Sequence, residues 1–153
     1  MAIGDTSLKV ELALLQSLTS SDFMALASLQ GHSGRGGWDY VWGNRNDRYQ
    51  HMVIRAGHGL AGTALRLGRW VKIDGAGAEN SQERLHCPMM LAEHLQSAAV
   101  FPLMTTANRQ IVGLIYLGKR KQSNFEVNEL LAAQEKIATL ASLLEGIIQE
   151  TAK

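Results

Sequence analysis

The stretch AAVFPLMTTANRQIVGLIYLGK, residues 98–119, decides the fold. It contains two apolar runs, 98–105 and 110–119, with the polar segment 106–109 between them. Two apolar runs joined by a short polar turn are typical of a β-hairpin. We therefore expect an antiparallel hairpin here, at the centre of a sheet.

Upstream of the hairpin, the sequence predicts one helix and four shorter strands. The strands are expected at 22–29, 36–43, 52–55 and 70–73, where apolar, alternating or β-branched residues lie between turn residues. The first two flank a glycine-rich segment, and a polar turn, 44–47, follows the second. The helix is expected over 6–19, with an apolar face made of Leu8, Leu12, Leu15 and either Leu18 or Thr19.

A long helix is expected over residues 125–150. Ser123 and Glu126 have the spacing of a capping box, which marks a helix start. Its predicted apolar stripe contains Val127, Leu130, Leu131, Ile137, Leu140, Ala141, Leu144 and Ile148. The stripe is broad for one sheet contact, which favours an additional helix partner from this chain or from another copy.

Two short helices are predicted between the strands. The first follows the turn 56–59, covers 60–67 and ends at Gly68. The second runs from Pro88 to about His94, with Cys87 at its cap position, because proline suits the first turn of a helix. The breaker-rich loop 74–80 lies between the two helices.

This order of elements predicts an α+β sandwich. One antiparallel sheet would carry the N- and C-terminal helices on one face, and the short helices and loops would form a ligand pocket on the other. The length of 153 residues fits a single domain, 1–153, that buries its own core.

The composition limits the classes of binding partner that we expect for this protein. The chain is 46% hydrophobic and 19% charged, with a formal net charge of +1, so it predicts binding to neither nucleic acid nor an anionic membrane. No targeting or membrane-spanning pattern is evident, and we expect a cytoplasmic protein. Cys87 is a single cysteine, which excludes an internal disulfide.

Two segments carry a resemblance to a known family. They are WDYVWGNRNDRY at 38–49 and IRAGHGLAG at 54–62. Both resemble the GAF family and, within it, the nitrate-receptor branch that accompanies bacterial sensor kinases. The resemblance implies a nitrate held between the sheet and the two short helices by backbone amides and a tryptophan indole N–H. The matching positions here are Trp38, Leu60 and Ala61.

Backbone chemistry supports an anion site independently. Gly57 and Gly59 permit a turn that larger residues resist, so the first amides of the following helix, those of Leu60, Ala61 and Gly62, can point at one enclosed space. The positive end of the helix dipole then favours an anion without a buried cation. Beyond Pro88, the second short helix offers the free amides of Met89 and Met90 opposite. These two side chains are bulky and flexible, so a ligand somewhat larger than nitrate is an alternative.

Several of these residues have alternative interpretations. Tyr40 and Arg55 are placed as supports of the pocket, although Arg55 and Arg48 also suit ordinary surface charges. Trp38 and Tyr49 also suit packing roles in the core.

The histidines and the single cysteine near the predicted pocket are candidates for metal or thiol chemistry. His51, His58 and His86 show no familiar ligand spacing with Cys87, so we expect no metal and no cofactor other than the bound anion. Cys87 is either a reactive thiol at a helix start or an inert, half-buried one.

We therefore predict a non-catalytic nitrate or small-anion receptor that modulates a sensor histidine kinase of a two-component system in trans. The chain shows no phosphate-binding loop and no DNA-reading helix, so a bound signal must pass to another protein. Two alternatives remain: a domain for another small metabolite, or a dimerisation module built from the helices at 6–19 and 125–150. A free methionine sulfoxide reductase, also a GAF activity, needs more than one thiol.

Overall fold

The computed structural model describes residues 3–29, 37–75, 85–106, 109–121 and 124–151. The elements follow the order expected from the sequence, except that a short 3-10 helix is added and the strand expected over 52–55 is absent. They are α1 (Ile3–Thr19), β1 (Phe23–Ser28), β2 (Tyr40–Trp42), η1 (Arg48–His51), α2 (Gly59–Leu67), β3 (Val71–Ile73), α4 (Pro88–Glu93), β4 (Ser97–Met104), β5 (Ile111–Lys119) and α5 (Val127–Thr151).

The described strands form a five-stranded sheet in the order β2-β1-β5-β4-β3, and every pairing is antiparallel. The expected hairpin is confirmed: β4 and β5 pair from Ser97 with Lys119 to Met104 with Ile111. β5 is the central strand, flanked by β1 and β4. The hairpin therefore forms the middle of the sheet, as the long apolar runs indicated.

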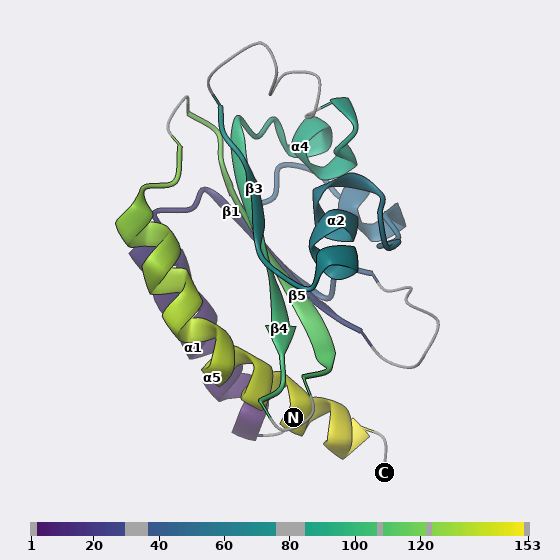
Figure 1. The fold of residues 1–153 in the computed structure, drawn as a ribbon, viewed down its shortest axis with the longest axis vertical. Coiled ribbons are helices and arrows are strands. Elements are labelled where there is room, and N and C mark those ends of the chain that lie inside the picture. Colours follow the sequence, from purple (N-terminus) through teal and green to yellow (C-terminus); the bar gives the residue numbers. More distant parts are fainter. Residues whose placement is uncertain (1–2, 30–36, 76–84, 107–108, 122–123, 152–153) are drawn as a thin grey trace.

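Both faces of the sheet are covered, which confirms the α+β sandwich (Figure 1). α1 and α5 lie together on one face, where Leu8, Leu15 and Leu140 pack with Phe101 and Leu117. The other face carries η1, α2 and α4. β1 alternates between the two layers, because Phe23 and Ala25 face the short helices while Met24 and Leu26 face the long ones.

Of the expected strands, one is much shorter than the sequence suggested and another is absent. The strand expected over 36–43 is reduced to Tyr40–Trp42, because the next residue, Gly43, turns the chain with a φ of 75°. The strand expected over 52–55 was wrong, since Ile54 alone makes a bridge. η1 precedes it, and Arg55 begins a turn in which its carbonyl accepts a hydrogen bond from His58.

The helix ends agree in part with the expectations. Gly68 ends α2 in the left-handed conformation, and Cys87 is the residue before α4. α5 begins at Val127, and the Glu129 carboxylate accepts from the Glu126 N–H, so the observed cap lies three residues later than expected. Ser123 lies outside the described residues.

Burial corrects two positions in the predicted apolar faces and decides a third that the sequence left open. Val127 is 71% exposed and Leu131 is 58% exposed, so neither belongs to the buried stripe of α5. Thr19 is fully buried whereas Leu18 is exposed, because the Thr19 hydroxyl returns a hydrogen bond to the Leu15 carbonyl. Over the described ranges, no helix has the length and apolar character needed to span a bilayer.

Candidate ligand pocket

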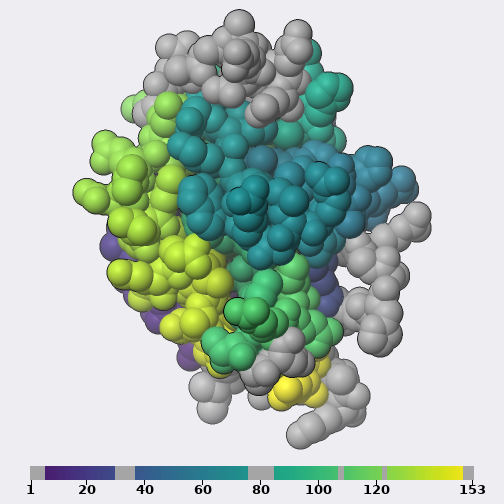
Figure 2. Space-filling model, in the orientation of Figure 1, coloured from purple at the N-terminus to yellow at the C-terminus, as the bar shows by residue number. Residues whose placement is uncertain are grey.

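A pocket of about 490 Å³ lies between the sheet and the short helices. Its floor includes Tyr116 of β5, and Trp38 enters from the segment before β2. Leu60 and Ala61 at the start of α2 line one wall, and Met89 of α4 lines another. Figure 2 shows α2 (teal) on the face of the molecule that also presents α5 (yellow-green).

The pocket is open on one side, unlike the enclosed space expected from the sequence. Val53, Gly57, His58 and His86 contribute to its lining and are exposed to solvent. These residues belong to connecting segments, so a ligand can enter without separation of the sheet from α2.

Three amides at the start of α2 are available to a ligand. The N–H groups of Gly59, Leu60 and Ala61 have no hydrogen-bond partner among the described residues. The Gly62 N–H donates to the His58 carbonyl at 3.1 Å, so Gly62 does not offer its amide as the sequence suggested. The positive end of the α2 dipole therefore faces the pocket through three donors.

The turn before α2 depends on glycine for two different reasons. Gly57 and Gly59 have φ values of 84° and 69°, in the region that side chains resist. Gly62 has an ordinary φ, but a Cβ there would collide with the carbonyl oxygen of Arg55. The Gly57 N–H also donates to the Gly62 carbonyl at 2.8 Å, which closes the turn over the first residues of the helix.

α4 borders the pocket through Pro88 and Met89, whereas the expected Met90 is not among the lining residues. The Met90 side chain is 1% exposed and packs in the core. The Leu91 N–H donates to the Cys87 carbonyl, and the amides of Met89 and Met90 have no partner in the described part of the chain.

Trp38 lies against the floor of the pocket. It is 9% exposed, and its ring meets that of Tyr116 edge to face, with centroids 5.6 Å apart. No described residue accepts a hydrogen bond from its indole N–H. Trp38 is thus both a core aromatic and a lining residue. Its packing role and its place in the pocket are therefore compatible.

Two residues expected to support the pocket lie elsewhere. Tyr40 packs on the opposite face of the sheet, where it lines a groove of about 290 Å³ beside α1. The reason is strand parity: its neighbour Val41, not Tyr40, packs on the pocket side. Arg55 is exposed and contributes its backbone carbonyl to the turn instead of its charge.

Tyr116 is a polar pocket residue that sequence reasoning missed, as it missed the three apolar lining residues at 52–54. Its hydroxyl is buried and has no hydrogen-bond partner among the described residues. Burial raises the pKa of the Tyr116 phenol well above its ordinary value of 10, and the nearby Cys87 raises it further. The signal was present in the sequence, because Tyr116 is the one hydroxyl-bearing residue of the apolar segment 111–119.

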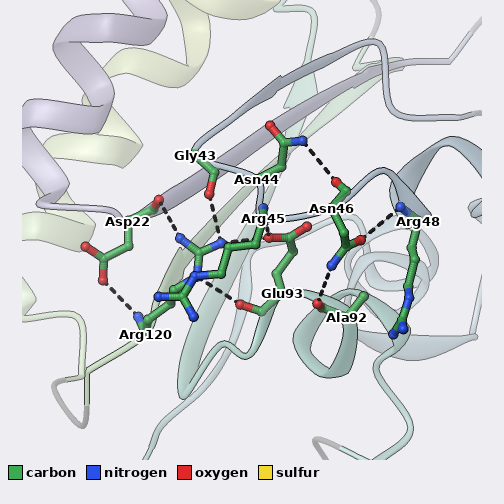
Figure 3. Close-up of polar contacts among 9 residues, drawn as sticks. All are labelled: Asp22, Gly43, Asn44, Arg45, Asn46, Arg48, Ala92, Glu93 and Arg120. Atoms are coloured by element: carbon green, nitrogen blue, oxygen red, sulfur yellow. Dashed lines mark hydrogen bonds and ion pairs between the residues drawn. The ribbon is translucent and has the colours of Figure 1, made fainter.

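A buried ion pair fastens α4 to the sheet (Figure 3). The Arg120 guanidinium lies 2.7 Å from a Glu93 carboxylate oxygen, and Glu93 is 1% exposed. Arg120 also donates to the carbonyls of Glu93, Asp22 and Gly43, at 2.9, 3.3 and 2.8 Å. One side chain therefore joins α4, the start of β1 and the end of β2.

Hydrogen bonds to Glu93 and Ala92 hold the polar segment after β2 to α4 (Figure 3). The Arg45 N–H donates to the Glu93 carboxylate at 2.7 Å, and the Asn46 amide donates to the Ala92 carbonyl at 2.7 Å. Asn46 also accepts from the Arg48 N–H, while the Arg48 side chain is exposed. Arg48 therefore serves this segment through its backbone.

The lining of the pocket is mainly apolar. No lysine, arginine, aspartate or glutamate lines the pocket among the described residues. The same part of the chain holds no group of three histidine, cysteine, aspartate or glutamate side chains suited to a metal. The polar groups of the lining are backbone donors, the exposed histidines His58 and His86, a buried tyrosine and a buried thiol, Cys87.

The fold is that of a GAF domain. The chain aligns with the GAF domain of a two-component sensor histidine kinase from Bacillus halodurans over 99% of each chain, with a TM-score of 0.74 and 16% identity. A type II free methionine-R-sulfoxide reductase from Thermoplasma acidophilum shares the fold, at a TM-score of 0.70 and 17% identity. No protein-family model and no curated protein matches the sequence.

Within that class, the chain is similar to NreA from Staphylococcus aureus. A form of NreA mutated in its nitrate binding site is 28% identical, with a TM-score of 0.66 over 81% of this chain and 91% of that one. The resemblance to GAF domains and to their nitrate-receptor branch, inferred from the segments 38–49 and 54–62, is thus confirmed.

Proposed function

We propose that this protein is a non-catalytic receptor for nitrate or another small oxyanion. The observation that carries the proposal is the set of free amides at Gly59, Leu60 and Ala61 beside the indole of Trp38 in one pocket. The similarity to NreA, a protein with a nitrate binding site, supports the same ligand.

The physical basis is a neutral site that attracts negative charge. Backbone N–H groups at a helix start carry partial positive charge and need an acceptor. An anion bound there needs no lysine or arginine, and the described lining contains neither, although His58 and His86 also line the pocket. A singly charged ion suits such donors, whereas a multiply charged one would favour a site with arginine or lysine.

Pocket volume bears on the size of the ligand. At about 490 Å³, the pocket falls within the range of small-molecule sites and far exceeds the share of one water, about 30 Å³. Nitrate would therefore be accompanied by water, and a larger oxyanion such as a small carboxylate also fits. The family resemblance favours nitrate, and a panel of ligands distinguishes the two.

Titration calorimetry with nitrate, nitrite, chloride and acetate tests the proposal. We expect saturable binding of nitrate, and we expect Trp38→Phe to weaken it because an aromatic ring is kept while the indole N–H is lost. Trp70→Phe is the matched control, since Trp70 stacks on Phe101 away from this pocket. Absence of binding by the whole panel would overturn the receptor proposal.

The partner we propose is a sensor histidine kinase, acting in trans in the cytoplasm. Ligand would favour one arrangement of the turn before α2 and shift the population of a kinase-binding form. In a reconstituted mixture, nitrate should change kinase autophosphorylation only when this protein is present. An unchanged rate with the wild-type protein, under conditions where calorimetry detects nitrate, would contradict it.

A specific surface feature also favours a homodimer. Val10, Leu14 and Leu18 recur every four residues along α1 and are 56%, 45% and 47% exposed. Such a stripe on the outside of the helical layer suits packing against a second copy. Sedimentation velocity should show dimers that Leu14→Lys converts to monomers. A wild-type protein that stays monomeric at high concentration would exclude this interface.

A further inference from the structure

The Tyr116 hydroxyl stands out among the polar groups around the pocket. It is buried, lines the pocket and has no hydrogen-bond partner in the described part of the chain. A buried hydroxyl without a partner is costly to the folded protein, so native structures rarely keep one without a reason. A ligand that enters the pocket is a natural partner for it.

The ring of Tyr116 is fixed from two sides. Phe23 meets it edge to face at 6.1 Å between centroids, and Trp38 does so at 5.6 Å. Such aromatic contacts hold a ring in one orientation. The hydroxyl is therefore a preorganised donor, which loses little side-chain entropy when a ligand binds.

We propose that Tyr116 donates its O–H to the bound ligand and makes the pocket selective for polyatomic oxyanions over monatomic ones. This inference rests on the proposed receptor function and adds the basis of its selectivity. The phenol keeps its proton at neutral pH, since burial raises its pKa, and so it serves as a donor to an anion.

The selectivity for polyatomic anions follows from the positions of the hydrogen-bond donors on two walls of the pocket. The α2 amides belong to one wall, and the Tyr116 hydroxyl belongs to the sheet beneath it. An anion with several oxygen atoms presents separate acceptors to the two walls, whereas a monatomic ion presents a single centre to both sets of donors. Chloride would then accept hydrogen bonds from the α2 amides but none from Tyr116.

Calorimetry on wild type, Tyr116→Phe and Tyr40→Phe tests this inference. Tyr40→Phe removes the same atom from the opposite face of the sheet and serves as the control. We expect Tyr116→Phe to weaken nitrate and acetate binding about tenfold, the scale of one hydrogen bond, and to leave chloride binding unchanged. Tyr40→Phe should match the wild type.

The outcomes separate this inference from the receptor proposal. If wild type binds nitrate and Tyr116→Phe binds it equally well, the role of Tyr116 is refuted and the receptor stands. If nitrate and chloride weaken by the same factor in Tyr116→Phe, the selectivity is refuted. If wild type binds no anion, the receptor proposal itself fails. Thermal unfolding of both variants without ligand confirms that each is folded before it is titrated.

Discussion

Replacing Arg120 with methionine removes the cation that faces the buried Glu93 carboxylate. The remaining charge would be 1% exposed and would keep one hydrogen bond, from the Arg45 N–H at 2.7 Å. Three backbone carbonyls, of Glu93, Asp22 and Gly43, would also lose a donor. This perturbation therefore tests the fastening of α4 to the sheet directly.

The expected loss is about 3–5 kcal/mol, the cost of breaking a buried ion pair by removal of one partner. Domains of this size have a total stability of about 5–15 kcal/mol, so Arg120→Met would be marginally folded. Arg120→Lys keeps the charge but loses the planar fork that reaches several oxygens, and we expect a smaller loss of about 1–2 kcal/mol.

Urea unfolding followed by circular dichroism measures these losses, and a double mutant identifies their origin. Glu93→Gln removes the charge but keeps an oxygen for the Arg45 N–H. Combined with Arg120→Met, it should recover about 2 kcal/mol relative to Arg120→Met alone, because no uncompensated charge stays buried. A loss below about 1 kcal/mol in Arg120→Met, or no recovery in the double mutant, would refute the reasoning.

Other predictions concern glycine and tyrosine. Gly62→Ala should cost about 1–3 kcal/mol in thermal unfolding, because a Cβ would collide with the Arg55 carbonyl. Gly146→Ala in α5, where a Cβ meets nothing within 4 Å, should instead stabilise by about 0.5–1 kcal/mol, and equal effects would contradict the account. Without ligand, Tyr116→Phe should stabilise by about 1 kcal/mol, since an unpartnered buried hydroxyl is removed; destabilisation would mean that the hydroxyl has a partner. The folded-state pKa of Tyr116 lies above the unfolded value, so its contribution to stability is complete below about pH 10 and is lost as pH rises further. Relative to Tyr116→Phe, wild type should lose about 1.4 kcal/mol per pH unit above pH 10, and parallel curves there would exclude the shift.

Local patterns in the sequence were enough for most of the fold. The hairpin of β4 and β5 follows from two apolar runs and one turn, and the limits of α2 follow from Gly57, Gly59 and Gly68. The strand expected at 52–55 failed because its backbone groups are used in turns on either side, which residue type does not reveal.

The site was harder to predict because its parts meet only in three dimensions. Trp38 and the α2 amides were anticipated, but Tyr116 faces the pocket through the parity of β5, and Tyr40 faces away through the parity of β2. A shift of one residue in either strand would reverse these assignments. The ion pair of Glu93 with Arg120 joins residues 27 positions apart, and no rule of sequence spacing predicts it.

Because Arg120 binds α4 but not α2, the two helical walls of the pocket differ in how firmly they are held. α4 is pinned by an ion pair and several hydrogen bonds, whereas no side chain of α2 within the described ranges forms a hydrogen bond to another element. α2 is held mainly by apolar contacts such as those of Leu60 and Ala64, which tolerate sliding better than directed bonds do. We therefore expect α2, which follows Gly57 and Gly59, to move when ligands of different size bind. The α4 wall should keep its position.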